Sequence, residues 1–281
     1  MQSSDQSEVQ NIVKKSGSSF YWGMRILPKK QMRAMFAIYA YCRTVDDIAD
    51  DIKDKKLRIK LLNDWENKIK SIFKGVKVDG ALEREIKISI KKFKLEENDF
   101  LSIIKGMKMD SSKSIIFPSK KNLNLYCDRV AVAVGYLSIK IFGLSDPAKP
   151  YALYLGRAFQ LTNIVRDFAE DFERGRCYIS SNYLKKYSIK KDMKVLIKSQ
   201  FLQRILQDLL KDAGKYFDKA EKEALKLDKK KIIASEIMKL FYYRIYKKMA
   251  KKKISIQTKI KLSNWDKLAI FFNILMRKKS Y

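Results

Sequence analysis

The sequence predicts an all-α protein. Its 281 residues include 10 glycines and 4 prolines, which is few for a β-rich or loop-rich fold and typical of long helices. Hydrophobic residues make up 46% of the chain, enough for a sizeable core. Most segments repeat apolar residues at i, i+3 and i+4, the spacing of one helix face. We expect a flexible N-terminus over residues 1–15 and one helical domain over residues 16–281, built from roughly ten helices.

The expected helices follow one another without a change in composition that would mark a linker. The segment 122–143 is mostly apolar, and its small residues Ala131, Ala133 and Gly135 predict the close approach of a neighbouring helix. The segment 177–184 is short and irregular. Two or three lysine-rich amphipathic helices extend to about residue 253. The helices expected before them cover residues 29–52, 55–74, 81–93, 95–110, 122–143 and 146–176.

The composition excludes several kinds of active site. The chain has no histidine, which excludes a Ser-His-Asp triad and a histidine-bearing zinc site. Its three cysteines are odd in number and far apart, so a reducing cytoplasm is the simpler context. The first ten residues lack the pattern of a secretory signal, and there is no run of 18 apolar residues. We expect a cytoplasmic protein, with a peripheral position on the inner membrane face left open.

The formal net charge of +30 admits three interpretations. It can reflect a lysine-biased genome, favour anionic substrates or an anionic membrane surface, or mark a nucleic-acid binder. The basic residues are spread along the chain, and no known nucleic-acid motif accompanies them. We therefore expect no nucleic-acid partner.

Two acidic pairs stand out in this basic chain. "DDIAD" places Asp46 and Asp50 four residues apart, and "DFAED" does the same for Asp167 and Asp171. On a helix each pair projects from one face, where like charges destabilise the helix by a few tenths of a kcal/mol. Asn163 lies four residues before Asp167 and extends that ridge of oxygen atoms. Mg²⁺ would offset the repulsion, because it binds carboxylate oxygens and completes its coordination with water or phosphate.

Arginines flank both pairs. Arg43 precedes Asp46 by three residues, Arg166 is next to Asp167, and Arg174 and Arg176 follow. Carboxylates that hold a metal ion, beside guanidinium groups that bind phosphate, describe a site for a diphosphate–Mg²⁺ complex. The alternative is a solvated charged face in which the arginines simply pair with the aspartates.

Three segments make the sequence recognisable. "YCRTVDDIAD", "YCDRVAVAVG" and "QLTNIVRDFAEDFERGRCYI" resemble the signature segments of the squalene/phytoene synthase family. The resemblance is good over about residues 16 to 185 and weak beyond. The opening "SGSSFYWGMRILPKKQMRAMFAIYAYCRTVDDIADD" is most similar to the bacterial presqualene diphosphate synthases of the hopanoid pathway.

The resemblance implies an isoprenoid synthase fold with a central cavity and an Mg²⁺-dependent prenyl transferase activity. The family's reaction joins two farnesyl diphosphates head to head into presqualene diphosphate. It implies two or three Mg²⁺ ions, a route toward squalene and hopanoids, and a downstream squalene-forming enzyme as partner. The implied metal ligands are Asp46, Asp50, Asn163, Asp167 and Asp171. The implied catalytic residues are Asp46, Asp50, Tyr126, Asp167 and Asp171, and the implied substrate-binding residues are Phe20, Tyr21, Arg43, Gln160, Arg166 and Tyr243.

Three alternatives remain at this stage. A phytoene synthase would use geranylgeranyl diphosphate, and the residues that set cavity depth cannot be identified from the sequence. A squalene synthase would complete the reduction with NADPH, which we do not expect because no GxGxxG segment follows a strand. A non-catalytic, membrane-associated helical protein is the alternative from another class. Retention of all four motif aspartates argues against it.

The C-terminal tail "WDKLAIFFNILMRKK" is apolar but too short to span a membrane. Its apolar residues have roughly helical spacing and basic residues flank them. The tail either packs on the core or lies in a membrane interface, drawn to anionic lipid. The apolar face comprises Trp265, Leu268, Ala269, Phe271, Phe272, Leu275 and Met276, and the flanking basic residues are Lys267, Arg277, Lys278 and Lys279.

Overall fold

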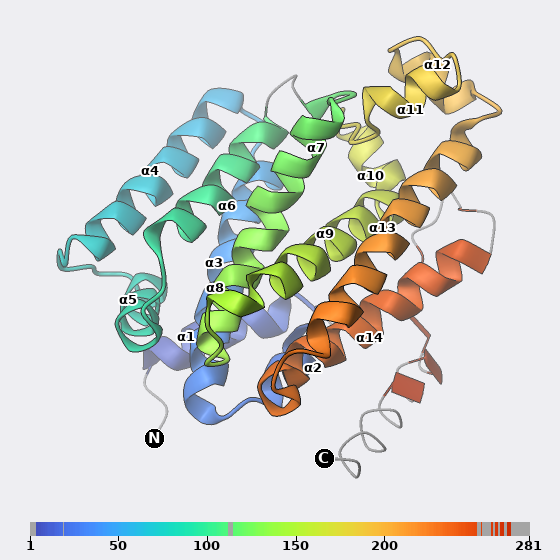
Figure 1. Cartoon of the computed structure of the whole chain (residues 1–281). Helices are drawn as coiled ribbons and strands as arrows, with labels where there is room; N and C mark the ends of the chain where they lie inside the picture. The colour runs from blue at the N-terminus through green and yellow to red at the C-terminus, as the bar shows by residue number, and fades with distance from the viewer. Residues whose placement is uncertain are drawn as a thin grey trace.

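The computed structural model describes residues 4–18, 20–111, 115–251, 254, 260, 262–263, 265–266 and 269–270. Within this part of the chain every regular element is helical, apart from an isolated bridge between Ile116 and Cys177. The predicted all-α fold is confirmed (Figure 1). The α-helices are α1 (Ser4–Lys15), α2 (Phe20–Arg25), α3 (Lys29–Asp51), α4 (Lys55–Phe73), α5 (Ala81–Phe93), α6 (Glu97–Asp110), α7 (Lys120–Cys127), α8 (Ala133–Ile141), α9 (Lys149–Arg166), α10 (Phe168–Glu173), α11 (Ser181–Lys186), α12 (Met193–Lys198), α13 (Leu202–Ala224) and α14 (Lys229–Lys251).

Helices α3 and α9 organise the rest of the molecule. In Figure 1, α3 to α6 lie on one side, α13 and α14 on the other, and α8 and α9 between them. α9 packs against α8, α13 and α14, and α3 packs against α1, α4, α5 and α6. One large apolar cluster is built mainly by α1 to α6 and α8, and a second mainly by α7 and α9 to α14. A cavity lies between them, because α3, α8 and α9 contribute residues both to these clusters and to its walls.

The N-terminus differs from the prediction. Residues 4–15 form α1 instead of a flexible segment. Val9 and Val13, one turn apart, are buried against the core. Asp5 accepts two hydrogen bonds of 2.7 Å from the guanidinium of Arg84 on α5. This segment is polar in composition but carries one apolar stripe, and such a stripe is enough for a short helix to pack against the core.

The small residues of α8 allow α9 to approach closely, as predicted. A Cβ atom added at Gly135 would lie 3.2 Å from the side chain and carbonyl of Ala152 on α9. A Cβ atom added at Gly156 on α9 would lie 3.0 Å from the Cα atom of Val132. The backbones are thus nearly in contact, and side chains on both helices can reach the same cavity.

The segment expected as one helix over residues 122–143 contains a change of winding. The π-helix η2 (Asp128–Val132) separates α7 from α8. Arg157 on α9 holds the start of η2, because its Nε and Nη2 atoms each donate a 2.7 Å hydrogen bond to the Asp128 carboxylate. π-turns of this kind are rare and are frequent at functional sites. Apolar periodicity alone does not distinguish an α-helix from one with a single wider turn.

The expected number of helices was too low because several are short. α2, α10, α11 and α12 each contain six residues. Such segments give too few repeats for an apolar pattern to be read. α2 was not predicted, and α11 begins inside the segment expected to be irregular.

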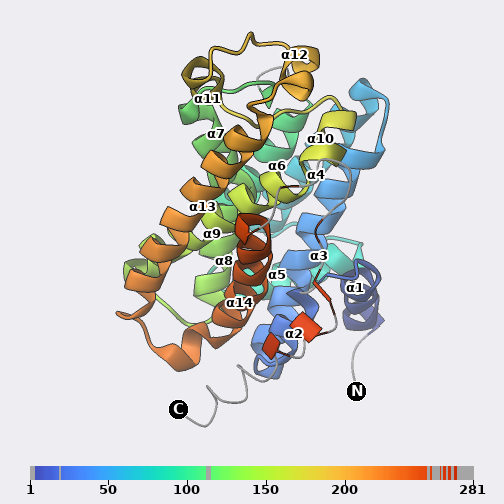
Figure 2. The same cartoon turned by 90° about the vertical axis from the view of Figure 1, so that its right-hand side faces the viewer.

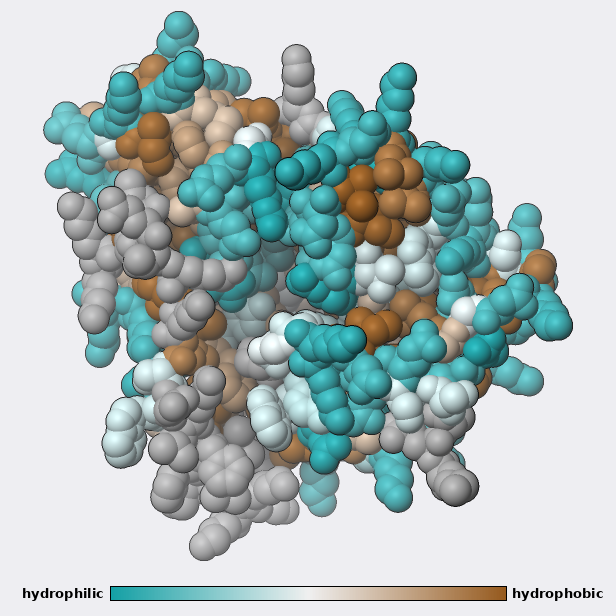
Figure 3. Space-filling view, turned by 180° about the vertical axis from the view of Figure 1, so that it is seen from behind, coloured by the Kyte–Doolittle hydropathy of each residue, from teal (hydrophilic) through white to brown (hydrophobic). Residues whose placement is uncertain are grey.

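Most of the C-terminal tail lies outside the described residues, including Leu268, Phe272 and Met276. Of the parts described, Trp265 is 81% exposed, whereas Ile270 packs against Ile237 and Phe241 of α14. Asp266 is buried and bonds to Arg244 and Lys248 of α14. Within the described residues the chain contains no helix long and apolar enough to cross a membrane. Figure 3 shows hydrophilic residues spread over one face of the molecule, with hydrophobic residues between them.

We expect Gly156→Ala to lower the free energy of unfolding by about 1–3 kcal/mol, because the new methyl group meets the backbone of η2 and neither helix can yield locally. The measurement is the midpoint of thermal unfolding. Gly23→Ala is the matched control: its Cβ would meet the flexible side chain of Met238 at 3.1 Å, which can turn away. Equal midpoints for the two variants would contradict the close approach of η2 and α9.

Candidate active site

The cavity has a volume of about 490 Å³ and two chemically different ends. Its walls come from α2, α3, α6, α7, α8, α9, α10 and α14 together with η2, and Figure 2 shows α3 and α9 from a second direction. Charged side chains gather where α3 and α9 end, and apolar side chains line the remainder. The charged lining residues are Arg43, Asp46, Asp50, Asp110, Arg166, Asp167, Glu170, Asp171, Arg174 and Arg176.

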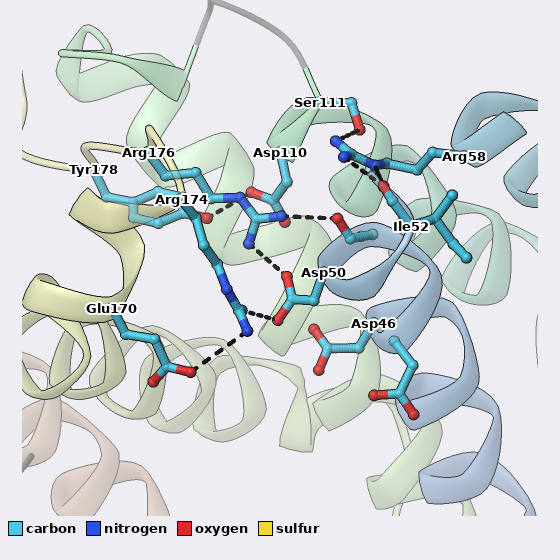
Figure 4. Close-up of polar contacts among 12 residues, drawn as sticks. Asp46, Asp50, Ile52, Arg58, Asp110, Ser111, Glu170, Arg174, Arg176 and Tyr178 are labelled. Atoms are coloured by element: carbon cyan, nitrogen blue, oxygen red, sulfur yellow. Dashed lines mark hydrogen bonds and ion pairs between the residues drawn. The ribbon is translucent and has the colours of Figure 1, made fainter. Parts of the chain in front are cut away.

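The first acidic pair lies in the last two turns of α3. The carboxylate of Asp50 forms ion pairs with Arg174 and Arg176 from across the cavity, as Figure 4 shows. Nη1 of Arg176 donates to Oδ1 of Asp50 at 2.5 Å, and Arg174 pairs with the other oxygen. Nη2 of Arg176 also donates to the carbonyl of Ala49 at 2.9 Å. Asp46 points into the cavity with a weaker partner, Arg43 at 3.5 Å.

The second acidic pair spans a break that the sequence did not predict. α9 ends at Arg166 and α10 begins at Phe168, yet the helical register continues. The amide of Asp167 donates to the carbonyl of Asn163 at 2.8 Å, and that of Asp171 to Asp167 at 2.9 Å. Asn163, Asp167 and Asp171 therefore still follow one another at one-turn intervals. Arg166 donates to both oxygens of Asp167, at 2.8 and 2.6 Å.

A further carboxylate, that of Asp110 at the end of α6, forms hydrogen bonds with two tyrosines at the charged end of the cavity, which we call the mouth. It accepts hydrogen bonds from the hydroxyl of Tyr178 at 2.7 Å and from that of Tyr126 at 3.3 Å. The two rings stack with centroids 4.8 Å apart. Burial raises the pKa of the Tyr126 hydroxyl well above its ordinary value, with a further contribution from Asp110. Tyr126 is therefore a protonated hydrogen-bond donor at neutral pH.

Three helices present their C-terminal ends to this site. α3 ends at Asp51, α6 at Asp110 and α9 at Arg166. The last carbonyl groups of a helix carry partial negative charge, which attracts cations. The backbone therefore adds to the negative potential of the carboxylates. This arrangement is favourable once positive charge is present at the mouth and unfavourable without it.

Burial and the closeness of other negative charges raise the pKa values of three carboxyl groups at the mouth. Burial, followed by repulsion from Asp167, raises the pKa of Asp171 to about 8. Burial and repulsion from Asp50 raise the pKa of Asp46 to about 7. Burial raises the pKa of Asp110 to about 6, against the opposing effect of nearby Arg176 and Tyr178. Each of these three carboxyl groups therefore binds a proton more strongly than an exposed carboxyl group does.

The chemistry of the donor set fits hydrated Mg²⁺ bound together with diphosphate. Among the described residues, six carboxylates and four guanidinium groups line the cavity, so the mouth is locally acidic in a basic protein. The buried Oδ1 atom of Asn163 has no hydrogen-bond partner in the described part of the chain. No three described Asp, Glu, Cys or His residues converge closely enough to hold an ion by themselves. Mg²⁺ commonly takes one or two protein carboxylates and fills its other positions with water and phosphate.

The structure brings most of the sequence-predicted site residues to this cavity. All five implied metal ligands line it, as do Phe20, Arg43, Tyr126, Gln160 and Arg166. Their roles remain predictions. Among the apolar residues of η2, α8 and α9, Val130, Val134 and Phe159 line the cavity, whereas Leu137 is buried in the core.

Tyr21 and Tyr243 lie outside the lining of this cavity, and their predicted role in substrate binding stays a prediction. The ring of Tyr21 stacks on Phe36 with centroids 5.8 Å apart, outside the cavity lining. Tyr243 packs against Tyr246 and is 37% exposed. The neighbouring Tyr242 reaches the cavity instead and stacks on Phe159 with centroids 4.1 Å apart. Neighbouring residues on a helix point in directions about 100° apart, so Tyr242 and Tyr243 project from different faces of α14.

Sequence reasoning also missed Asp110, Tyr178 and Tyr242. Asp110 stands alone at a helix end, without a second acid at helical spacing to signal it. Tyr178 lies in the irregular segment after the second acidic pair, where no periodicity assigns a face. Both are identified by their contacts across the fold.

The site is thus an all-helical cavity with an acidic, arginine-flanked mouth and an apolar interior. A family model described as Squalene/phytoene synthase matches residues 13–266. Presqualene diphosphate synthases from Zymomonas mobilis and Rhodopseudomonas palustris are each 38% identical to the chain. The first aligns over 83% of this chain and 80% of the relative, the second over 90% and 91%.

A crystal structure of a dehydrosqualene synthase in complex with a ligand has the same fold. Its TM-score is 0.83 at 24% sequence identity, with 99% of this chain and 97% of that chain covered. The chain belongs to the squalene/phytoene synthase family, and it is a prenyl transferase.

The raised pKa values predict how stability depends on pH. Between the unfolded pKa of 3.8 and the folded value of about 8 for Asp171, the folded state binds more protons than the unfolded state. The stability of the metal-free protein should therefore fall as pH rises through this range. Mg²⁺ binds the ionised carboxylates, so it should raise the unfolding temperature more at about pH 9 than at about pH 6.

Differential scanning fluorimetry with and without Mg²⁺ checks this pH dependence. Asp171→Asn is the control, because it removes the titrating group and should reduce the difference between the two pH values. A stabilisation by Mg²⁺ that is equal at both pH values, or an unchanged difference in Asp171→Asn, would contradict the assignment.

Proposed function

We propose that the enzyme condenses two molecules of farnesyl diphosphate head to head into presqualene diphosphate and releases one diphosphate. The observation that carries the proposal is the two-ended cavity, with its diphosphate-binding mouth opening onto an apolar interior. The relatives described as presqualene diphosphate synthases, which align over most of the chain, support the choice of product.

The charged mouth binds and orients the two diphosphate groups. Arg43 and Arg166 line the cavity beside the aspartates, and their planar guanidinium groups can each donate two hydrogen bonds to phosphate oxygens. Asp46, Asp50, Asn163, Asp167 and Asp171 would hold Mg²⁺, which supplies neutralising charge to the leaving diphosphate. Breaking the C1–O bond of one substrate then leaves an allylic cation inside the cavity.

The apolar interior protects and directs that cation. Phe20, Phe159 and Tyr242 form a contacting group of rings, with Phe20 and Tyr242 centroids 5.5 Å apart. Such ring faces stabilise positive charge, and the surrounding apolar side chains exclude the water that would convert the cation to farnesol. The C2=C3 double bond of the second substrate attacks C1 of the cation. Loss of a proton then closes the cyclopropane ring, and the second diphosphate stays on the product.

The proton acceptor is the departing diphosphate. Tyr126 is unsuited to that role, because burial keeps its hydroxyl protonated and Asp110 and Tyr178 already engage it. Its position at the mouth suits a hydrogen bond to a diphosphate oxygen. Reduction to squalene would fall to a separate downstream enzyme. A position at the inner membrane face, from which the insoluble chains would enter, stays a prediction.

We expect incubation with farnesyl diphosphate and Mg²⁺ to yield presqualene diphosphate, identified by mass spectrometry, in equal amounts with and without NADPH. Chelation of the metal should abolish the product. Conversion to squalene when NADPH is added would instead indicate the full synthase. A product that forms from geranylgeranyl diphosphate and not from farnesyl diphosphate would indicate a phytoene synthase.

Asp46→Ala and Asp171→Ala should each lower kcat by about 10²-fold or more with saturating Mg²⁺, because each removes charge that holds metal at the leaving group. Asp51→Ala is the matched control, since Asp51 is an exposed carboxylate on the same helix outside the cavity lining. Circular dichroism establishes that each variant is folded. Near-unchanged turnover in either cavity variant would remove that aspartate from the metal site.

A further inference from the structure

The cavity follows α9 away from the acidic mouth. Its lining residues on this helix recur at one-turn intervals, from Asn163 through Phe159 and Leu155 to Tyr151. Tyr151 precedes Asn163 by twelve positions, which corresponds to a rise of about 18 Å along the helix. Tyr151 therefore lies at the end of the cavity that is farthest along α9 from the diphosphate-binding mouth.

The far end of the cavity is closed by a polar network, which is unusual in an otherwise apolar wall. The hydroxyl oxygen of Tyr151 lies 2.9 Å from Oγ of Ser235 and 2.9 Å from Oε1 of Glu236, both on α14. Ser235 also lines the cavity, and its hydroxyl donates to the carbonyl of Ile232 at 2.8 Å. Tyr151 itself is 1% exposed. Its ring is thus held at both ends, by the backbone of α9 and by its hydroxyl group.

A buried ion pair anchors this network. Glu236 pairs with Nζ of Lys239 at 2.6 Å, and Lys239, whose side chain is 8% exposed, also pairs with Glu221 on α13. Turning the Tyr151 ring aside would leave Glu236 and Ser235 with fewer partners in a dry environment, which is costly. A leucine or methionine at this position could change rotamer without such a loss.

We propose that Tyr151, fixed by Ser235 and Glu236, closes the cavity and restricts the accepted prenyl diphosphate to fifteen carbons; this rests on the proposed function. Geranylgeranyl diphosphate carries one more five-carbon unit, at the end distant from the diphosphate. A chain that runs from the mouth along α9 places this extra unit against the Tyr151 ring. Because the ring cannot yield, the longer substrate loses its productive position at the mouth.

The test compares kcat/KM for geranylgeranyl and farnesyl diphosphate in the wild-type chain and its variants. Tyr151→Ala removes the ring and should raise the C20-to-C15 ratio at least tenfold. Tyr151→Phe and Ser235→Ala keep the ring and release its hydroxyl, so each should raise the ratio by a smaller factor. Tyr154→Ala is the matched control: Tyr154 lies on α9 but stacks on Tyr216 outside the cavity lining, so the ratio should not change.

A wild-type ratio in folded Tyr151→Ala would overturn the proposal. Should Tyr151→Ala fail to fold, unchanged ratios in both Tyr151→Phe and Ser235→Ala would overturn it equally. A rise in Tyr154→Ala as large as in the Tyr151 variants would also overturn it, since it would indicate general loosening of α9.

A binding measurement separates this proposal from the proposed function. Non-hydrolysable thiodiphosphate analogues of the two substrates report affinity without turnover. If the wild-type chain forms no product from farnesyl diphosphate, the proposed function fails. The preference for the C15 analogue over the C20 analogue, and its reduction in Tyr151→Ala, still test the role of the ring. If the wild-type chain forms product and Tyr151→Ala binds both analogues with the wild-type preference, the role of Tyr151 alone is disproved.

Discussion

The rest of the structure depends on one constraint: like charges are crowded together at the charged end of the cavity, which is partly shielded from water. Asp46, Asp50, Asp167 and Asp171 converge there, beside the C-terminal ends of three helices. The carboxylates repel one another and the negative ends of the helices until positive charge is supplied. Arginines supply part of it, most directly where Arg174 and Arg176 share Asp50. In the proposed function, cations bound together with the substrate would supply the remainder.

This constraint also accounts for the arrangement of the core. The positions of α3, α6 and α9 depend on one another, because all three helices end at the acidic mouth. The contact between Gly156 and η2 fixes α9 against α8, and the Arg157–Asp128 pair ties α9 to the same turn. The apolar interior follows from this packing, because α3 and α9 are held far enough apart for side chains to line a space between them. Water exclusion and charge placement therefore come from the same set of helix contacts.

The sequence was sufficient for the helices with long apolar stripes and for the ridge of Asn163, Asp167 and Asp171. These features are periodic, and a period can be read without coordinates. The break at Asp167 did not affect the ridge because the backbone hydrogen bonds continue across it. Asp110 and Tyr178 could not be identified in this way, since each acts through a partner far away in the sequence. The sequence also could not show that Tyr242 lines the cavity, because tertiary contacts decide the helix face when neighbouring residues are of one type.

The π-turn between α7 and α8 has a consequence for how this family can change over evolutionary time. A turn of this kind accommodates one residue more than an α-helical turn, so the segment from Asp128 to Val132 behaves as a one-residue insertion within a helix. Deleting one residue there would restore an uninterrupted α-helix but rotate Tyr126 by about 100° relative to α8. Insertions and deletions in this segment would turn the two halves of the cavity wall apart, whatever residues it contained. Selection would have to preserve its length, together with Asp128, which pairs with Arg157.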